Sequence, residues 1–174
     1  GLRPDACRRE HPECGGVLRS MDQRFLDSTS ILPAKLEELL AAPIRQAGEP
    51  WPKEKISGVY LFSEGGRPIY VGRSRNIRQR YRAHLTLSHN SGSFAFLMAR
   101  LNTGTLQASY KPDGSRQKLQ EDPVFRSAFQ SARDRIKSMD FQYVVEADPV
   151  TQCLLEVYCA LALKTDKYNK FDTH

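Results

Sequence analysis

The sequence predicts an α/β (α+β) fold, in which three strands and flanking helices form one small domain after a helical N-terminal arm. The chain has 174 residues, of which 40% are hydrophobic, and this is enough to bury one core of ordinary size. Two β-rich runs flank a glycine-rich turn, and a third run follows much later. Between the strands, apolar residues recur at helical spacing. We assign residues 1–50 to the arm and residues 51–174 to the domain.

The arm is expected to contain one helix. Apolar residues fall near helical spacing between Ile31 and Ile44, and Pro33 is tolerated in a first helical turn. The segment 48–55 reads GEPWPKEK, and its glycine and two prolines indicate a linker. The role of the arm stays open at this point.

The domain is expected to open with a β-hairpin followed by a helix. Residues 56–62 form a β-rich run, residues 63–68 have turn chemistry, and residues 68–72 form a second short run. A helix is predicted from Asn76 to about Leu87, because three apolar residues lie one turn apart on one stripe: Ile77, Tyr81 and Leu85.

The second half of the domain contains two Asp-Pro pairs, which mark the starts of helices. Such a pair places an N-cap and a first-turn proline at the start of a helix. We therefore predict helices that begin at Asp122-Pro123 and at Asp148-Pro149, the latter running to about Lys164. The remaining elements are a helix over 94–101, an exposed irregular loop over 105–121 and a third strand over 141–147.

Composition excludes several classes of protein. No apolar run is long enough to span a membrane, and the first twenty residues lack the apolar region of a secretory signal. The four cysteines are too few for a disulfide scaffold, so we expect a reducing, cytoplasmic location. Three potential metal ligands near the N-terminus have no fourth ligand close by, and whether they bind metal stays open: Cys7, His11 and Cys14.

The positive charge is concentrated in one segment. The net charge is +6, yet residues 65–112 contain no Asp or Glu and carry +8, which leaves −2 for the rest of the chain. Seven of the eight cations in this segment are arginines, whose guanidinium groups hold phosphate in a bidentate fork. The segment favours a polyanionic partner, although a solvated helix face would show a similar run of charge.

Glu156 is the single charged residue in the apolar run 153–163. A helix that is apolar on nearly every side is expected to be buried, and a buried carboxylate needs a cation, a metal ion or hydrogen-bond donors. Two interpretations therefore remain open. Glu156 could form a buried pair with an arginine, or it could be a metal ligand or an acid–base group.

The segment 70–84, YVGRSRNIRQRYRAH, combines phosphate-binding and proton-transferring groups. Arg80 and His84 lie four residues apart and share one helix face, while Arg78 and Arg82 share the neighbouring face. A turn at Gly72 followed by a helix N-terminus would add backbone N–H donors for a phosphate. His84 taken alone could also be a structural histidine of the core.

These residues resemble the GIY-YIG nucleases. Gly58-Val59-Tyr60 is followed, after a slightly shorter gap than is usual in that family, by Tyr70-Val71-Gly72. Further matches come in the family's order: the basic residue Arg73, then Arg80, His84, Glu156 in an apolar helix, and the pair Tyr168-Asn169. The resemblance covers roughly residues 56–171 and implies a central three-stranded, mainly antiparallel sheet.

The resemblance also implies a metal-dependent endonuclease acting on double-stranded DNA. Carried over by position, Glu156 would hold Mg²⁺ (or Mn²⁺), Arg80 would neutralise charge on the phosphate, and Asn169 would hydrogen-bond around the site. Tyr60 or His84 would be the general base, a choice that stays open, and Tyr70 would orient water or phosphate. Four arginines would contact DNA: Arg73, Arg75, Arg78 and Arg82.

Three functions remain open from the sequence. The first is a sequence-specific, type II restriction-like endonuclease, for which a palindromic target would favour a homodimer. The second is a structure-specific nuclease of repair, recombination or mobile elements. The third is a DNA-binding module that has lost catalysis. The target sequence or structure and the cleavage pattern are not predicted.

Overall fold

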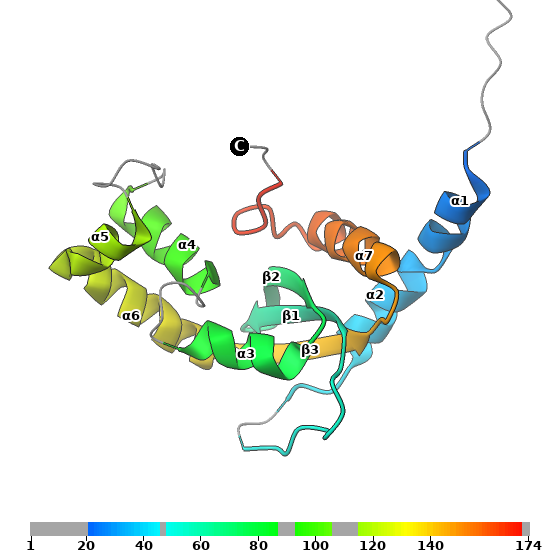
Figure 1. The fold of residues 1–174 in the computed structure, drawn as a ribbon, viewed down its shortest axis with the longest axis horizontal. Helices are drawn as coiled ribbons and strands as arrows, with labels where there is room; N and C mark the ends of the chain where they lie inside the picture. Colours follow the sequence, from blue (N-terminus) through cyan, green and yellow to red (C-terminus); the bar gives the residue numbers. More distant parts are fainter. Residues whose placement is uncertain (1–20, 46–47, 87–92, 106–114, 172–174) are drawn as a thin grey trace, which may run out of the picture.

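The computed structural model describes residues 21–45, 48–86, 93–105 and 115–171. It confirms an α+β fold with a three-stranded antiparallel sheet, flanking helices and a helical N-terminal region (Figure 1). The elements follow one another as α1 (Gln23–Ser30), α2 (Leu32–Ala41), β1 (Gly58–Glu64), β2 (Arg67–Ser74), α3 (Ile77–Leu85), α4 (Ser93–Thr103), α5 (Arg116–Glu121), α6 (Pro123–Lys137), β3 (Asp140–Val145) and α7 (Pro149–Ala162).

The sheet has the order β2-β1-β3, and both pairings are antiparallel. The predicted hairpin is confirmed: β1 and β2 are joined by the two residues Gly65 and Gly66. Both have positive φ, +57° and +74°, as a two-residue turn that matches the strand twist requires. Glycine adopts these angles without the steric cost that other residues incur. The turn sets the pairing of Ser63 with Pro68, and a one-residue irregularity then shifts the register so that Phe62 pairs with Tyr70.

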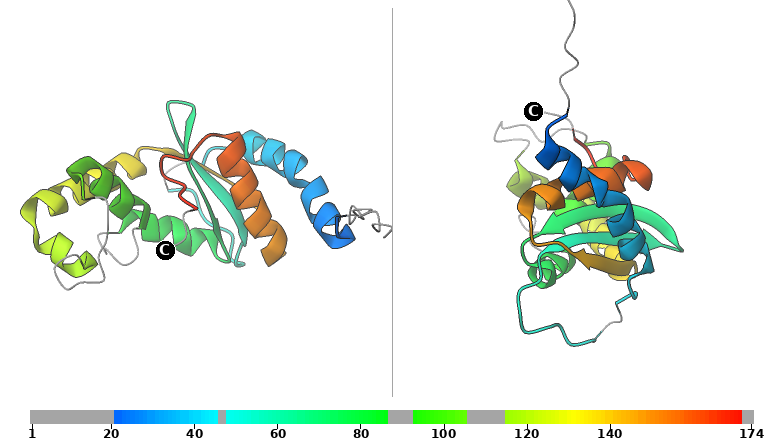
Figure 2. Two further views of the ribbon diagram at one scale, coloured as in Figure 1. Left: turned by 90° about the horizontal axis from the view of Figure 1, so that it is seen from above. Right: turned by 90° about the vertical axis from the view of Figure 1, so that its right-hand side faces the viewer.

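The alternation of side chains along β1 creates two cores, one on each face of the sheet. Tyr60 and Phe62 point to the face covered by α3, α4 and α6, where a large aromatic cluster forms. Val59 and Leu61 point to the other face and pack with residues of α2 and α7. The view from above shows these three layers, with the sheet between the two groups of helices (Figure 2). β1 is consequently buried on both faces.

Both predicted Asp-Pro helix starts are confirmed. The Asp122 carboxylate accepts a hydrogen bond from the backbone N–H of Val124 at 2.7 Å, and Asp148 accepts one from Thr151 at 2.7 Å. In each helix the proline occupies the first turn, where its missing N–H would have no intrahelical partner.

The N-terminal region contains two helices where the sequence predicted one. The helix expected from Ile31 to Ile44 is the shorter α2, and the preceding α1 was not predicted because none of its residues is buried. Leu32 and Leu39 of α2 lie in the core beside α7. The arm–domain boundary at residues 50 and 51 stays a prediction, and Cys7, His11 and Cys14 lie outside the described residues.

Two other sequence predictions are corrected. The loop expected over 105–121 contains α5, a short helix capped by the Ser115 side chain, which accepts from the N–H of Lys118 at 3.3 Å. The apolar helix α7 is an outer layer, not a buried helix: one side packs on the sheet, and Cys153 and Leu161 on other sides are exposed. In the part of the chain that the structure describes, no helix combines the length and apolar character needed to cross a membrane.

Candidate active site

Gly72 makes room for the tyrosine at the centre of the site. It lies inside β2, directly opposite Tyr60 in the register, so the turn predicted at this position is wrong. A Cβ atom on residue 72 would lie 2.3 Å from the Tyr60 hydroxyl, closer than any real contact. The Tyr60 side chain therefore crosses the neighbouring strand where that strand has no side chain. This packing explains why a glycine is needed at position 72.

The Tyr60 hydroxyl joins Arg80 to His84 in one hydrogen-bonded chain. Arg80 Nε donates to Tyr60 Oη at 3.2 Å, and Tyr60 Oη lies 2.8 Å from His84 Nε2. A guanidinium can only donate, so the hydroxyl accepts from Arg80, and the direction of its bond to His84 follows from the tautomer of the imidazole. In the tautomer that carries its proton on Nδ1, His84 Nε2 accepts from the Tyr60 hydroxyl; in the other tautomer, Nε2 donates to it. The structure thus brings together three of the residues that the sequence analysis singled out.

Burial keeps both ends of this hydrogen bond neutral. Tyr60 is 1% exposed and His84 is 0% exposed. Burial raises the pKa of Tyr60 well above its ordinary value, and it lowers the pKa of His84 to about 3, with the charge of Arg80 adding to the effect. Within the described residues, His84 Nδ1 is buried without a hydrogen-bond partner. The low pKa makes the neutral His84 imidazole a weak base, so protonating it requires a compensating negative charge nearby.

The low pKa of His84 predicts a specific dependence of stability on pH. In the unfolded chain the imidazole titrates near its ordinary pKa of 6.5, whereas the folded protein stays unprotonated at this site down to about pH 3. As the pH falls below about 6.5, only the unfolded state takes up this proton, so the free energy of unfolding falls by up to about 1.4 kcal/mol per pH unit. We expect a His84→Gln variant to lack this decrease between pH 6.5 and pH 5 in denaturant titrations. Equal slopes for the two proteins would contradict the assignment.

Arg80 is held from a second side by Ser93, a residue that the sequence analysis missed. Arg80 Nη2 donates to Ser93 Oγ at 2.9 Å at the start of α4. No local pattern marks this serine, since it lies thirteen residues from Arg80 and meets it only through the fold. Tyr70 completes this side of the site: its ring stacks on Phe94 with centroids 4.3 Å apart, and burial raises its pKa.

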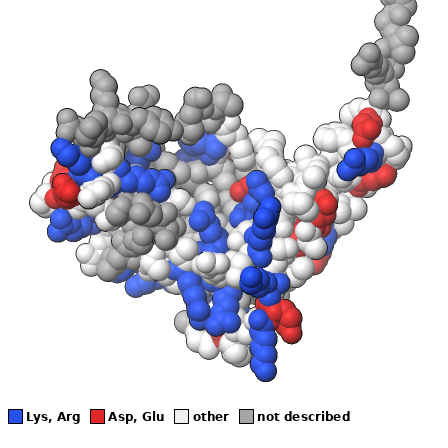
Figure 3. All heavy atoms as spheres, viewed as in Figure 1, with Lys and Arg blue, Asp and Glu red and all other residues white. Residues whose placement is uncertain are grey.

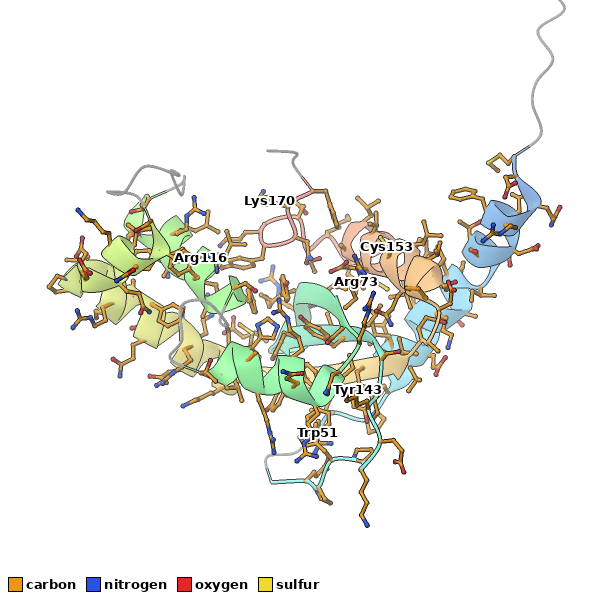
Figure 4. The ribbon with its side chains drawn as sticks, viewed as in Figure 1. Trp51, Arg73, Arg116, Tyr143, Cys153 and Lys170 are labelled. Atoms are coloured by element: carbon orange, nitrogen blue, oxygen red, sulfur yellow. The ribbon has the colours of Figure 1, made fainter. Side chains whose placement is uncertain are left out.

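Glu156 projects from α7 and pairs with Arg73 of β2. Arg73 Nε donates to Glu156 Oε2 at 2.9 Å, and Figure 4 shows Arg73 between the strand and the helix. The pair is partly accessible, since the side chains are 43% and 22% exposed, respectively. Burial raises the pKa of Glu156, and Arg73 works against that shift. Glu156 therefore forms the ion pair with an arginine that was one of its two interpretations, although this pair is less buried than the sequence indicated.

The donor set at Glu156 fits a weakly held hard cation. Within the described ranges, no group of three or more His, Cys, Asp or Glu side chains could enclose a metal ion. Magnesium nevertheless retains several waters and is commonly bound by one or two carboxylates together with substrate phosphates. A single, partly exposed carboxylate beside arginines suits that mode of binding, in which the substrate supplies further oxygens.

Asn169 fastens the segment after α7 to the edge strand β2. Its side-chain amide makes two hydrogen bonds to the backbone of Val71. Oδ1 accepts from the N–H of Val71 at 3.0 Å, and Nδ2 donates to the carbonyl of Val71 at 2.7 Å. Thr165 Oγ1 also donates to Asn169 Oδ1 at 2.9 Å. The side chain is 8% exposed, so these bonds are made inside the protein. Asn169 thereby fixes the strand positions between Tyr70 and Gly72.

The other arginines of the basic segment face outward. Arg75 follows β2, while Arg78 and Arg82 are one turn apart on α3, and all three side chains are exposed. Lys and Arg side chains lie over the middle of the face viewed in Figure 3. Trp51 is half-buried against the aromatic core, and its ring stacks on Tyr143 with centroids 6.0 Å apart (Figure 4).

Comparison with known proteins reveals short local similarities. A segment of 44 residues, 25% of this chain, is 43% identical to UvrABC system protein C of Deinococcus radiodurans. A segment of 31 residues, 18% of the chain, is 52% identical to UvrABC system protein C of Aquifex aeolicus. The matched segments span only 7% and 6% of those two proteins. No protein-family model matches the sequence, and no solved structure matches it significantly.

Proposed function

We propose that this protein is a Mg²⁺-dependent endodeoxyribonuclease that hydrolyses phosphodiester bonds in double-stranded DNA. The observation that carries the proposal is the chain from Arg80 through Tyr60 to His84, next to a carboxylate. The charge of Glu156 is near enough to raise the pKa of both Tyr60 and Tyr70. A fixed guanidinium, a proton acceptor and a metal-binding oxygen are the groups that phosphodiester hydrolysis needs.

In the proposed reaction Tyr60 and His84 act as one proton relay. The raised pKa of Tyr60 argues against a free phenolate, so the hydroxyl takes a proton from the attacking water only as it passes its own proton to His84 Nε2. The water oxygen then bonds to phosphorus and one ester oxygen leaves. Burial and the positive charge of Arg80 both disfavour the His84 imidazolium that forms. A phosphate bound to Arg80 would offset the repulsion by the Arg80 charge.

The remaining residues bind and orient the substrate. Arg80, fixed between Tyr60 and Ser93, is placed to neutralise charge that develops on the phosphoryl oxygens. Glu156 would hold the metal ion, which supplies Lewis-acid polarisation of the phosphate and stabilises the leaving oxygen. Tyr70 would orient the water or the phosphate. The exposed arginines would contact the DNA backbone: Arg73, Arg75, Arg78 and Arg82.

We infer that the substrate class is closer to repair than to restriction. The local similarity to UvrABC system protein C supports a structure-specific nuclease of the repair type. A restriction-like enzyme would instead recognise a sequence, and a palindromic target would favour a homodimer. A cytoplasmic location goes with either activity.

The test is a cleavage assay with three DNA substrates. Purified protein is incubated with a supercoiled plasmid, a branched duplex and an ultraviolet-damaged duplex, in Mg²⁺ or in Mn²⁺, with EDTA as the control. We expect metal-dependent nicking of the branched or damaged duplex, at defined positions when the ends are mapped. Discrete plasmid fragments would replace the repair interpretation with the restriction one. Failure to cleave any of the three substrates would overturn the proposed activity.

A further inference from the structure

The Glu156 carboxylate, the proposed metal ligand, already has a cationic partner. Arg73 Nε lies 2.9 Å from Glu156 Oε2, the distance of a charge-assisted hydrogen bond. An arginine bonded to this oxygen and a divalent cation bound to it would repel one another at close range. A metal ion on the Glu156 carboxylate, even on the oxygen that Arg73 leaves free, is therefore disfavoured while Arg73 stays bonded to Oε2.

Arg73 is suited to a withdrawal from its partner, whereas Arg80 is not. Arg80 is anchored by two hydroxyls, Tyr60 Oη and Ser93 Oγ, and keeps its position in the absence of a ligand. The Arg73 side chain reaches Glu156 through Nε and is 43% exposed, while the backbone N–H of Arg73 also bonds to the carboxylate and does not depend on the side chain. Exposed ion pairs contribute little to stability because water solvates both partners well. Breaking this pair therefore costs little, and the freed guanidinium is at the surface where a DNA phosphate would lie.

We infer that Arg73 competes with the metal ion for Glu156 and transfers to a DNA phosphate when DNA binds, so that metal affinity depends on DNA. This inference rests on the proposed function. Without DNA, Arg73 weakens metal binding. With DNA, the phosphate attracts Arg73, and both the freed carboxylate and the phosphate oxygens become available to the metal. Linkage requires the converse as well: a metal ion on Glu156 releases Arg73 and strengthens DNA binding.

The first experiment measures Mn²⁺ binding without DNA, by the electron paramagnetic resonance signal of the free ion. We expect Arg73→Gln to bind Mn²⁺ about two- to five-fold more tightly than wild type, as the weakness of exposed ion pairs implies. Arg75→Gln is the matched control. Arg75 lies two residues from Arg73, its side chain is also exposed, and the substitution removes the same charge. Equal affinities for the Arg73 and Arg75 variants would overturn the inference.

The same titration separates this inference from the proposed function. Glu156→Gln is expected to abolish the Mn²⁺ site; unchanged Mn²⁺ binding in this variant would refute the metal site, and with it the proposed function. If Glu156→Gln loses the ion but Arg73→Gln behaves like Arg75→Gln, only the competition is refuted. Thermal melting of each variant verifies that it is folded.

The second experiment measures DNA binding in EDTA. Glu156→Gln releases Arg73 from its ionic partner, so we expect this variant to bind a duplex about two- to five-fold more tightly than wild type. Glu37→Gln, on the exposed side of α2, removes the same charge and controls for net charge. The double variant Arg73→Gln/Glu156→Gln should lose the gain. A gain that persists in the double variant would show that Arg73 does not carry it.

Discussion

Replacing Glu156 by glutamine is expected to lower the DNA cleavage rate by at least about a thousand-fold. The carboxylate is the proposed ligand of the metal ion, and metal polarisation of a phosphate contributes several kcal/mol to lowering the barrier. Glutamine has almost the same shape as glutamate, so the fold should be kept. The loss should therefore appear in the single-turnover rate at saturating protein, and raising the Mg²⁺ concentration should not restore it.

Two controls make this result specific to Glu156. Glu37→Gln, on α2, makes the same chemical change at an exposed site and should cleave like wild type. Circular dichroism melting of the Glu156 variant should show a change in stability of under about 1 kcal/mol, because the pair with Arg73 is partly exposed. A folded Glu156→Gln enzyme that retains a tenth or more of the wild-type rate would exclude this residue as the metal ligand.

Replacing Tyr60 by phenylalanine is expected to slow cleavage by about a hundred- to ten-thousand-fold. The substitution removes one oxygen atom, and that atom accepts from Arg80 and is hydrogen-bonded to His84 Nε2. The proposed relay to His84 Nε2 is then broken, and this buried nitrogen is left without its hydrogen-bond partner. We therefore also expect a stability loss of about 1–3 kcal/mol, the usual cost of an unsatisfied buried polar group. Rates should be measured well below the melting temperature of the variant.

Tyr81→Phe is the matched control for Tyr60→Phe. The Tyr81 ring packs against Phe62 and Phe141 in the same aromatic core, so the control removes the same atom from the same layer. We expect it to cleave within a few-fold of wild type. If both variants lose activity equally, the effect is one of packing and the relay is wrong. If Tyr60→Phe is as active as wild type, His84 does not receive a proton through Tyr60.

The elements that local chemistry specifies were predictable from the sequence. The Gly65-Gly66 turn requires positive φ at both positions, and each Asp-Pro pair supplies a cap and a tolerated proline, so these signals hold in any context. The helices α1 and α5 were missed because neither buries a residue. Such short helices show little of the apolar periodicity on which the prediction depended.

For the candidate site, the sequence indicated the residues but not their partners. It placed Tyr60, Arg80, His84 and Glu156 in one set, and the structure brings the first three into one hydrogen-bonded chain. It gave no sign of Ser93, which meets Arg80 only because α4 packs beside α3. It also assigned Gly72 to a turn, since a glycine that makes room for a side chain on the next strand leaves no local pattern.

By itself the sequence determined the order of the three strands and five of the helices, the acid-free segment of eight cations and the chemical groups available for a reaction. These depend on residue type and short-range spacing, which are read directly from the chain. Only the tertiary structure decided that His84 is neutral and that Glu156 is paired with Arg73 of a different element. A pKa depends on burial and on charges that are distant in sequence, and an ion pair across 83 residues depends on how α7 packs on the sheet.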